Sequence, residues 1–134
     1  MEVTGSCHCG AVQFEARIDP NRVGICHCTD CQTFSGSAFR TSVLVPGEDF
    51  RLIKGNPSTY EKTAESGNRR QLVFCGCCGT HVYGTTADVK TPRYSVRVGV
   101  LAQRKELRPV AQVWCRSELP WLPDLTDVHR VSTQ

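Results

Sequence analysis

The sequence predicts a mainly β fold of short antiparallel strands with one short helix. Short runs with the period-two alternation of a half-buried strand recur between turn signals built from Gly, Pro and Asn. Helix signals are scarce, and nine cysteines lie mostly in tight groups along the 134 residues. Strands of this length and spacing indicate a sandwich or an open, folded-over sheet. The chain length suits a single domain, residues 1–134.

The strands follow one another from local patterns. Residues 12–17 alternate apolar and polar side chains and lead into a turn at residues 19–21. Residues 42–45 are β-prone and are ended by Pro46 and Gly47. Further strands are expected at residues 50–54, 58–63, 71–74, 94–100 and 110–115, with turns at residues 55–57 and 66–68.

The one clear helix signal lies inside a cysteine group. Thr29, followed three residues later by Gln32, has the pattern of a capping box in which Thr29 is the N-cap. Asp30 would then lie in the first turn, where a negative charge suits the helix dipole. We therefore expect a short helix to begin at Thr29.

Charge and hydropathy exclude two classes of partner. The formal net charge is +3 and the basic residues are scattered, so we expect no nucleic-acid surface. No apolar run is long enough to span a bilayer, and the first ten residues lack the apolar centre of a signal peptide. We expect a cytoplasmic protein with no membrane partner. In a reducing cytosol, closely spaced cysteines favour metal binding over disulfides.

Four cysteines have the spacing of a closed zinc site: Cys7, Cys9, Cys75 and Cys78. The first two are two residues apart and would point to one side of an extended segment. The last two have the gap of a zinc knuckle, followed by Gly79 where a tight turn needs a positive φ. Four thiolates saturate Zn²⁺, so we expect a structural site. Cys77 in place of Cys78, or His8 in place of one thiolate, are the alternative ligands.

Cys26, Cys28 and Cys31 form a second group with no fourth cysteine nearby in sequence. Three protein ligands with one exchangeable position are the pattern of a catalytic zinc site, and a soft thiolate-rich site suits an incoming thiol. Two alternatives stay open at this point. A fourth side chain can close the site (Cys77, Cys115 or His27), or the three cysteines can form a redox cluster.

The motifs together resemble a known family. They are GSCHCGAV at residues 5–12, CHCTDC at 26–31 with SGSAF at 35–39, and FCGCCGT at 74–80, supported by residues 52–57, 99–101 and 114–122. Over about residues 3–125 the chain resembles the glutathione-dependent formaldehyde-activating enzyme family, which also includes centromere protein V. Two features depart from the family pattern: Cys77 is an added thiol, and residues 101–105 lack the acidic residues and proline of that loop.

The resemblance implies a β-tent of folded-over antiparallel sheets with two zinc ions. Cys7, Cys9, Cys75 and Cys78 match the structural site, and Cys26, Cys28 and Cys31 match the catalytic one. It also implies a carbon–sulfur lyase that adds glutathione to formaldehyde, an S-(hydroxymethyl)glutathione synthase-like activity. The thiol, the aldehyde and the oligomeric state do not follow from the motifs.

Several other residues are candidates for handling the substrates. A proton for the product alkoxide can come from His27, Asp30 or water. Residues 35–37 offer hydroxyl and backbone N–H groups, and at most one of two adjacent arginines faces the site because strand neighbours point opposite ways. The remaining candidates for the pocket are Arg69, Arg70, Trp114 and Trp121.

Two other functions fit parts of the pattern. A methionine sulfoxide reductase-like enzyme would use Cys115 as its nucleophile. A zinc-stapled, non-catalytic interaction module would have both metal sites closed by protein ligands.

Overall fold

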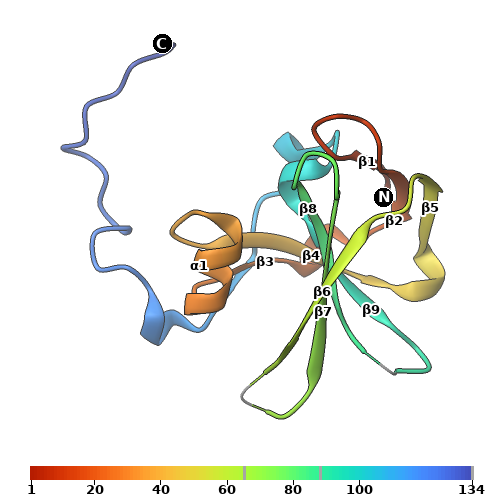
Figure 1. Cartoon of the computed structure of the whole chain (residues 1–134). Helices are drawn as coiled ribbons and strands as arrows, with labels where there is room; N and C mark the ends of the chain where they lie inside the picture. Colours follow the sequence, from red (N-terminus) through yellow and green to blue (C-terminus); the bar gives the residue numbers. More distant parts are fainter. Residues whose placement is uncertain (65, 88, 134) are drawn as a thin grey trace.

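The structure, a computed structural model, describes residues 1–64, 66–87 and 89–133. It confirms the mainly β prediction, with two sheets and one short helix, α1 (Thr29–Ser35), among these residues (Figure 1). The smaller sheet has the strand order β1-β2-β5, in which all pairs are antiparallel. Its strands are β1 (Glu2–Ser6), β2 (Gln13–Arg17) and β5 (Phe50–Lys54).

The larger sheet has the order β10-β3-β4-β9-β8-β7-β6. Its pairs are antiparallel except for β10 and β3, which run parallel. Its strands are β3 (Val23–Cys26), β4 (Arg40–Pro46), β6 (Ser58–Thr63), β7 (Arg69–Phe74), β8 (His81–Thr86), β9 (Arg93–Arg97) and β10 (Ala111–Val113). Short 3-10 turns occupy Pro20–Arg22, Gly47–Asp49, Val98–Val100, Arg104–Glu106 and Cys115–Ser117.

Most of the expected strands are present, with differences at their ends. Strand β9 stops at Arg97, and Val98–Val100 turns into a 3-10 helix instead of continuing the alternation to residue 100. The last expected strand, residues 110–115, shrinks to β10. The sequence did not predict strands β1, β3 and β8, so the two sheets contain more strands than expected.

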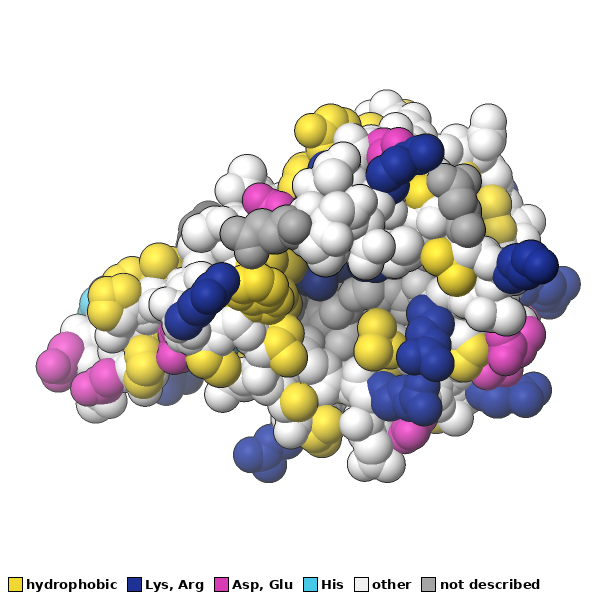
Figure 2. Space-filling view, turned by 90° about the horizontal axis from the view of Figure 1, so that it is seen from below, with side chains coloured by type: hydrophobic (Ala, Val, Ile, Leu, Met, Phe, Trp, Pro, Cys, Tyr) yellow, Lys and Arg dark blue, Asp and Glu magenta, His cyan; other side chains and the backbone are white. Residues whose placement is uncertain are grey.

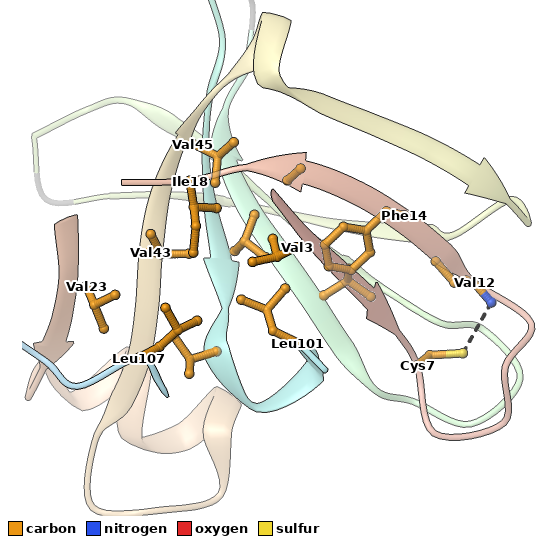
Figure 3. Packing of buried hydrophobic residues seen from close by; sticks show 14 of the residues in the cluster. Val3, Cys7, Val12, Phe14, Ile18, Val23, Val43, Val45, Leu101 and Leu107 are labelled. Carbon is orange, nitrogen blue, oxygen red and sulfur yellow. Dashed lines mark hydrogen bonds between the residues drawn. The ribbon is translucent and has the colours of Figure 1, made fainter. Parts of the chain in front are cut away.

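The core lies between the two sheets (Figure 3). In β1 and β2 alternate residues are buried, as the period of a strand with one buried face requires. Phe14 of β2 is 1% exposed, and its ring stacks on Phe50 at 5.0 Å. The Phe50 ring in turn packs edge-on against the rings of Tyr83 and Tyr94 of the larger sheet, with centroid distances of 5.1 and 5.0 Å. These aromatic rings join the two sheets.

The opposite face of the larger sheet carries polar side chains and is where α1 packs. Because Val43 and Val45 point into the core, their neighbours on β4 point to the other face. Phe34 of α1 contacts Tyr60 at 5.9 Å and His81 at 5.8 Å, which places the helix over this outer face. The site described below lies between α1 and this face.

The described residues contain no helix with the length and apolar content needed to cross a membrane.

Candidate functional site

The first cluster joins the start of the chain to the β7–β8 connection. The Sγ atoms of Cys7, Cys9, Cys75 and Cys78 all lie within 4.8 Å of one another. The Sγ–Sγ distance is 3.6 Å from Cys7 to Cys9 and 3.8 Å from Cys9 to Cys75. Tetrahedral zinc with sulfur at about 2.3 Å places its ligands about 3.8 Å apart. The donor set therefore fits a metal ion that prefers four thiolates.

Both chain segments that carry the cysteines of this cluster form tight turns. The N–H of Gly10 donates to the carbonyl of Cys7 (3.1 Å), so Cys9 lies in a tight turn and not in the extended segment expected from its spacing. On the other side Gly79 has φ +74° and its N–H donates to the carbonyl of Cys75 (2.8 Å). The positive φ expected at Gly79 is confirmed.

The structure separates Cys78 from the added thiol beside it. Cys78 lies within the cluster, whereas Cys77 lies outside it. The Oγ1 of Thr80 lies 3.2 Å from the Cys78 sulfur, and this hydrogen bond is the main cause that lowers the pKa of Cys78 to about 5. A thiol with a low pKa is readily available as a thiolate ligand.

The second cluster lies where β3 meets α1. Cys26 ends β3, Cys28 is the N-cap of α1, and Cys31 is in the first turn; their three Sγ atoms are within 4.8 Å of one another. The sulfur of Cys28 accepts a hydrogen bond from the N–H of Cys31 at 3.3 Å. A helix start thus places two of the three thiols.

The expected capping box is wrong by one residue. Cys28 has the extended backbone of an N-cap (φ −61°, ψ 151°), so Thr29 is the first helical residue. The Gln32 amide does not turn back to the N-cap N–H. It donates instead to the carbonyls of His27 (2.8 Å) and Ser117 (3.0 Å), which ties the C-terminal segment to the helix.

The three candidates for a fourth ligand lie elsewhere. Within the described residues, no further His, Cys, Asp or Glu ligand atom joins Cys26, Cys28 and Cys31. Cys77 and Cys115 are exposed outside this group. His27 is fully buried, its Nε2 donates to Gln112 Oε1 at 2.8 Å, and its ring packs edge-on against Phe39.

The thiols of the second cluster are unequal. A hydrogen bond from the Cys31 thiol lowers the pKa of Cys26 to about 5, and the same interaction raises the pKa of Cys31. Arg40 favours the thiolate form of both residues through its positive charge. Arg40 lies directly opposite Cys26 in the β3–β4 register, so the two side chains share one face of the sheet.

Two further arginines stand on this face. Arg97 of β9 lies opposite Ser42 of β4 and is only 8% exposed; its Nη1 donates to the Ser95 carbonyl at 3.0 Å. Arg70 of β7 is half-buried and donates to Thr86 Oγ1 at 2.6 Å. The sequence reading missed Arg40 and Arg97.

The neighbouring Arg69 points away and pairs with Glu61 at 2.8 Å. Arg69 and Arg70 thus face opposite sides of β7, as strand alternation predicts. Alternation along β9 places the Arg97 side chain on the other face of the sheet from the core residues Tyr94 and Val96, and this pattern can be read from the sequence.

A groove opens beside the second cluster. One cavity of about 540 Å³ is lined by Cys26, Arg40 and Trp114, and a second of about 400 Å³ is lined by Arg70. The two share the lining residues Leu44, Arg93 and Ser95. The molecular surface is hollowed when viewed from below, with basic and hydrophobic side chains at the border of the hollow (Figure 2).

Other candidates from the sequence have different places. The N–H groups of Gly36 and Ser37 donate to the carbonyls of Thr33 and Gln32 (both 3.3 Å) and close the helix, so they are not free to hold an oxyanion. The Asp30 carboxylate pairs with the Lys62 ammonium. Trp121 is 54% exposed and lines neither cavity.

Comparison with known proteins assigns the chain to a family. The sequence model of the family described as glutathione-dependent formaldehyde-activating enzyme matches residues 2–117. The chain belongs to this family. Both cysteine clusters fall within the matched residues.

Two similar proteins add context for this family member. An uncharacterized lyase of Schizosaccharomyces pombe is 26% identical over 95 residues, which cover 69% of this chain and 64% of that protein. The chain thus matches less than two thirds of that relative's length. A crystal structure of a Rhodobacter sphaeroides protein has a TM-score of 0.63 at 22% identity, covering 81% of this chain and 98% of that one. This likeness shows a shared fold.

Proposed function

We propose that this protein is a zinc-dependent carbon–sulfur lyase that joins a thiol such as glutathione to formaldehyde or another small aldehyde, giving an S-hydroxymethyl adduct. The observation that carries the proposal is the second cluster. Three thiols converge beside an open cavity, and no fourth ligand atom from the described residues joins them. Family membership supports the same chemistry.

The two clusters would have different roles. Cys7, Cys9, Cys75 and Cys78 would hold a structural zinc ion, since four thiolates leave no open position. Cys26, Cys28 and Cys31 would hold a catalytic one, which when bound would keep the substrate thiol in its nucleophilic thiolate form.

The side chains around the cavity would bind the reactants and stabilise the attacking thiolate. The cavity of about 540 Å³ beside Cys26 would receive the thiol and the aldehyde, and the positive charge of Arg40 would stabilise thiolate sulfur there. The substrate sulfur forms a bond to the carbonyl carbon, the π electron pair moves to oxygen, and that oxygen takes a proton. His27 is tied to Gln112 and Asp30 to Lys62, so we assign the proton to water in the open cavity.

The test compares two cysteine variants. Cys31→Ser removes one ligand of the second cluster, whereas Cys115→Ser removes an exposed thiol outside it. We expect wild type and Cys115→Ser to bind two zinc ions and accelerate adduct formation. Cys31→Ser should retain one zinc and lose the acceleration. Metal analysis and two-dimensional ¹³C exchange NMR, with the spontaneous reaction subtracted, measure both properties.

Two outcomes contradict the proposal. If Cys31→Ser keeps two zinc ions and full acceleration, the second cluster is not the site. If wild type shows S₄ coordination at both metals without added thiol by X-ray absorption, the chain is a closed zinc module. Reduction of methionine sulfoxide by wild type and not by Cys115→Ser, without any acceleration of adduct formation, would instead support a methionine sulfoxide reductase-like enzyme.

A further inference from the structure

Three arginines gather beside the second cysteine cluster from three different strands. Arg40 lies opposite Cys26 in the β3–β4 register, and Arg97 lies opposite Ser42, two residues further along β4. Arg70 comes from β7 and lines the adjoining cavity. Arg70 and Arg97 each interact electrostatically with both Arg40 and Cys31. The three guanidinium groups therefore form one positively charged recess, here called the arginine recess.

The arginine recess lacks a balancing carboxylate. Within residues 1–64, 66–87 and 89–133, none of the three forms an ion pair with Asp or Glu. Arg40 Nε and Arg97 Nη2 are buried without a hydrogen-bond partner. Burial lowers the pKa of Arg97 to about 9, which still leaves it cationic at neutral pH. A buried cation with unused donors is costly unless a ligand satisfies it.

The Arg97 guanidinium lies against the neighbouring strand β8. A side-chain carbon built at Gly84 would be 3.5 Å from Arg97 Nη2, an ordinary contact distance, and 3.3 Å from Leu72 Cδ2. Arg97 therefore packs over the backbone of β8 at Gly84.

The charge of the neighbouring thiols is too small to balance the recess. Three thiolates with one divalent metal ion would carry a net charge of −1, against +3 from the arginine recess, and Arg93, which lines both cavities, adds a further positive charge at the border of the groove. A substrate thiolate at the cluster would add one negative charge, which still leaves the groove positive. A carboxylate on a reactant would supply further negative charge there.

We infer that Arg40 and Arg70, supported by Arg97 beneath the groove, bind a carboxylate of the substrate beside Cys26, Cys28 and Cys31. The inference rests on the proposed function and narrows its substrate class to carboxylated reactants. The guanidinium fork pairs with a carboxylate through two hydrogen bonds, which orients as well as binds it. The carboxylate belongs either to the carbonyl compound, as in a 2-oxo acid, or to the thiol.

The carboxylate takes no part in the bond changes. Sulfur adds to the carbonyl carbon, the π pair moves to the oxygen, and water supplies the proton, as for formaldehyde. With a 2-oxo acid the carboxylate is one bond from the reacting carbon. Its capture opposite Cys26 would therefore hold that carbon near the cluster.

The experiment pairs charged and neutral reactants. With 2-mercaptoethanol as thiol, glyoxylate is compared with acetaldehyde; with formaldehyde, 3-mercaptopropionate is compared with 2-mercaptoethanol. Each pair is measured for zinc-loaded wild type, Arg70→Gln, Arg70→Lys and the control Arg51→Gln, whose side chain pairs with Glu15 on the other sheet. We expect Arg70→Gln to lower kcat/KM about 10- to 100-fold for carboxylated reactants of one pair. Neutral reactants and the control should change less than about twofold, and Arg70→Lys should recover part of the loss.

A binding measurement gives an independent readout. Arginine side-chain ¹⁵N signals are followed while propionate, or neutral propionamide, is added without any aldehyde. Saturable shifts of the Arg40 and Arg70 signals with propionate, and not with propionamide, support carboxylate binding in the arginine recess. If these shifts occur but no adduct forms, the proposed function fails and the inferred carboxylate site stands. Equal loss for charged and neutral reactants in Arg70→Gln, or no propionate response, overturns the inference and leaves the arginines as counter-charges to the thiolates.

Discussion

Gly5 is the position at which one added methyl group should disturb both the core and the first cysteine cluster. It lies opposite Phe14 in the β1–β2 pair, and a Cβ built there would be 2.0 Å from Phe14 Cζ and 2.3 Å from Cε1. The Phe14 ring is 1% exposed and stacks on Phe50, which is held by two tyrosines. The ring therefore has no free space to move into.

Gly5→Ala should destabilise the fold strongly. Overpacking a core costs about 1–3 kcal/mol, and a 2.0 Å contact with a ring that cannot retreat belongs at the upper end, about 3 kcal/mol. For a chain of this size that loss corresponds to a fall in Tm of about 10 °C. Because β1 ends at Ser6, directly before Cys7, zinc bound by the first cluster should also fall.

Guanidinium unfolding and thermal melting at a fixed zinc concentration measure the loss. The control is Gly99→Ala, since Gly99 is exposed, has no positive φ, and a Cβ there would meet no heavy atom within 4 Å. We expect the control to change the free energy of unfolding by less than about 0.5 kcal/mol. If Gly5→Ala unfolds within that same margin of wild type, the packing of β1 over Phe14 is incorrect.

Two further predictions concern acid stability and the turns around the clusters. Burial and the charge of Arg97 lower the pKa of His81 in the folded protein below the value of about 6.5 that it has in the unfolded chain. Between these two pKa values the unfolded chain binds more protons than the folded protein. The free energy of unfolding should therefore fall as the pH drops through this interval. His81→Gln should flatten this slope in pH-dependent urea unfolding while His129→Gln in the C-terminal segment does not; equal slopes in all three proteins would contradict it. Gly79 (φ +74°) and Gly36 (φ +61°) both have open space around them, so alanine at either should cost about 1–2 kcal/mol through backbone strain alone. Zinc titrations should show that Gly79→Ala weakens the four-cysteine cluster and Gly36→Ala does not, and a loss at the wrong cluster would refute the assignment of these turns.

The strands that the sequence did not reveal share one property. Strands β1, β3 and β8 each contain a glycine, at positions 5, 24 and 84. Glycine weakens the local β signal, because it has no side chain to pack and a high conformational entropy. In the fold, Gly5 admits the Phe14 ring, which a Cβ at this position would meet at 2.0 Å. At β1, the residue that hides the strand in the sequence is thus required by a contact with a residue of another strand.

The cysteine clusters and the arginine recess differ in how local they are. Cys26, Cys28 and Cys31 span six residues, so their spacing and a helix start suffice to bring the sulfurs together. Arg40 and Arg97 are far apart in sequence, and both reach the second cluster only because β4 pairs with β3 on one side and with β9 on the other. Alternation can place each arginine on a face of its own strand. It cannot say which strands are neighbours.

The burial of Arg97, like the positive charge of the arginine recess, indicates that an anionic ligand binds in the groove. A guanidinium that is 8% exposed, with an unpaired nitrogen and no acidic partner among the described residues, opposes folding of the free protein. Natural sequences keep such conflicts mainly where a ligand resolves them. The thiolates of the second cluster resolve part of this one, since they favour the charged form of Arg97. The remainder calls for an anion in the groove, which the sulfur chemistry by itself does not supply.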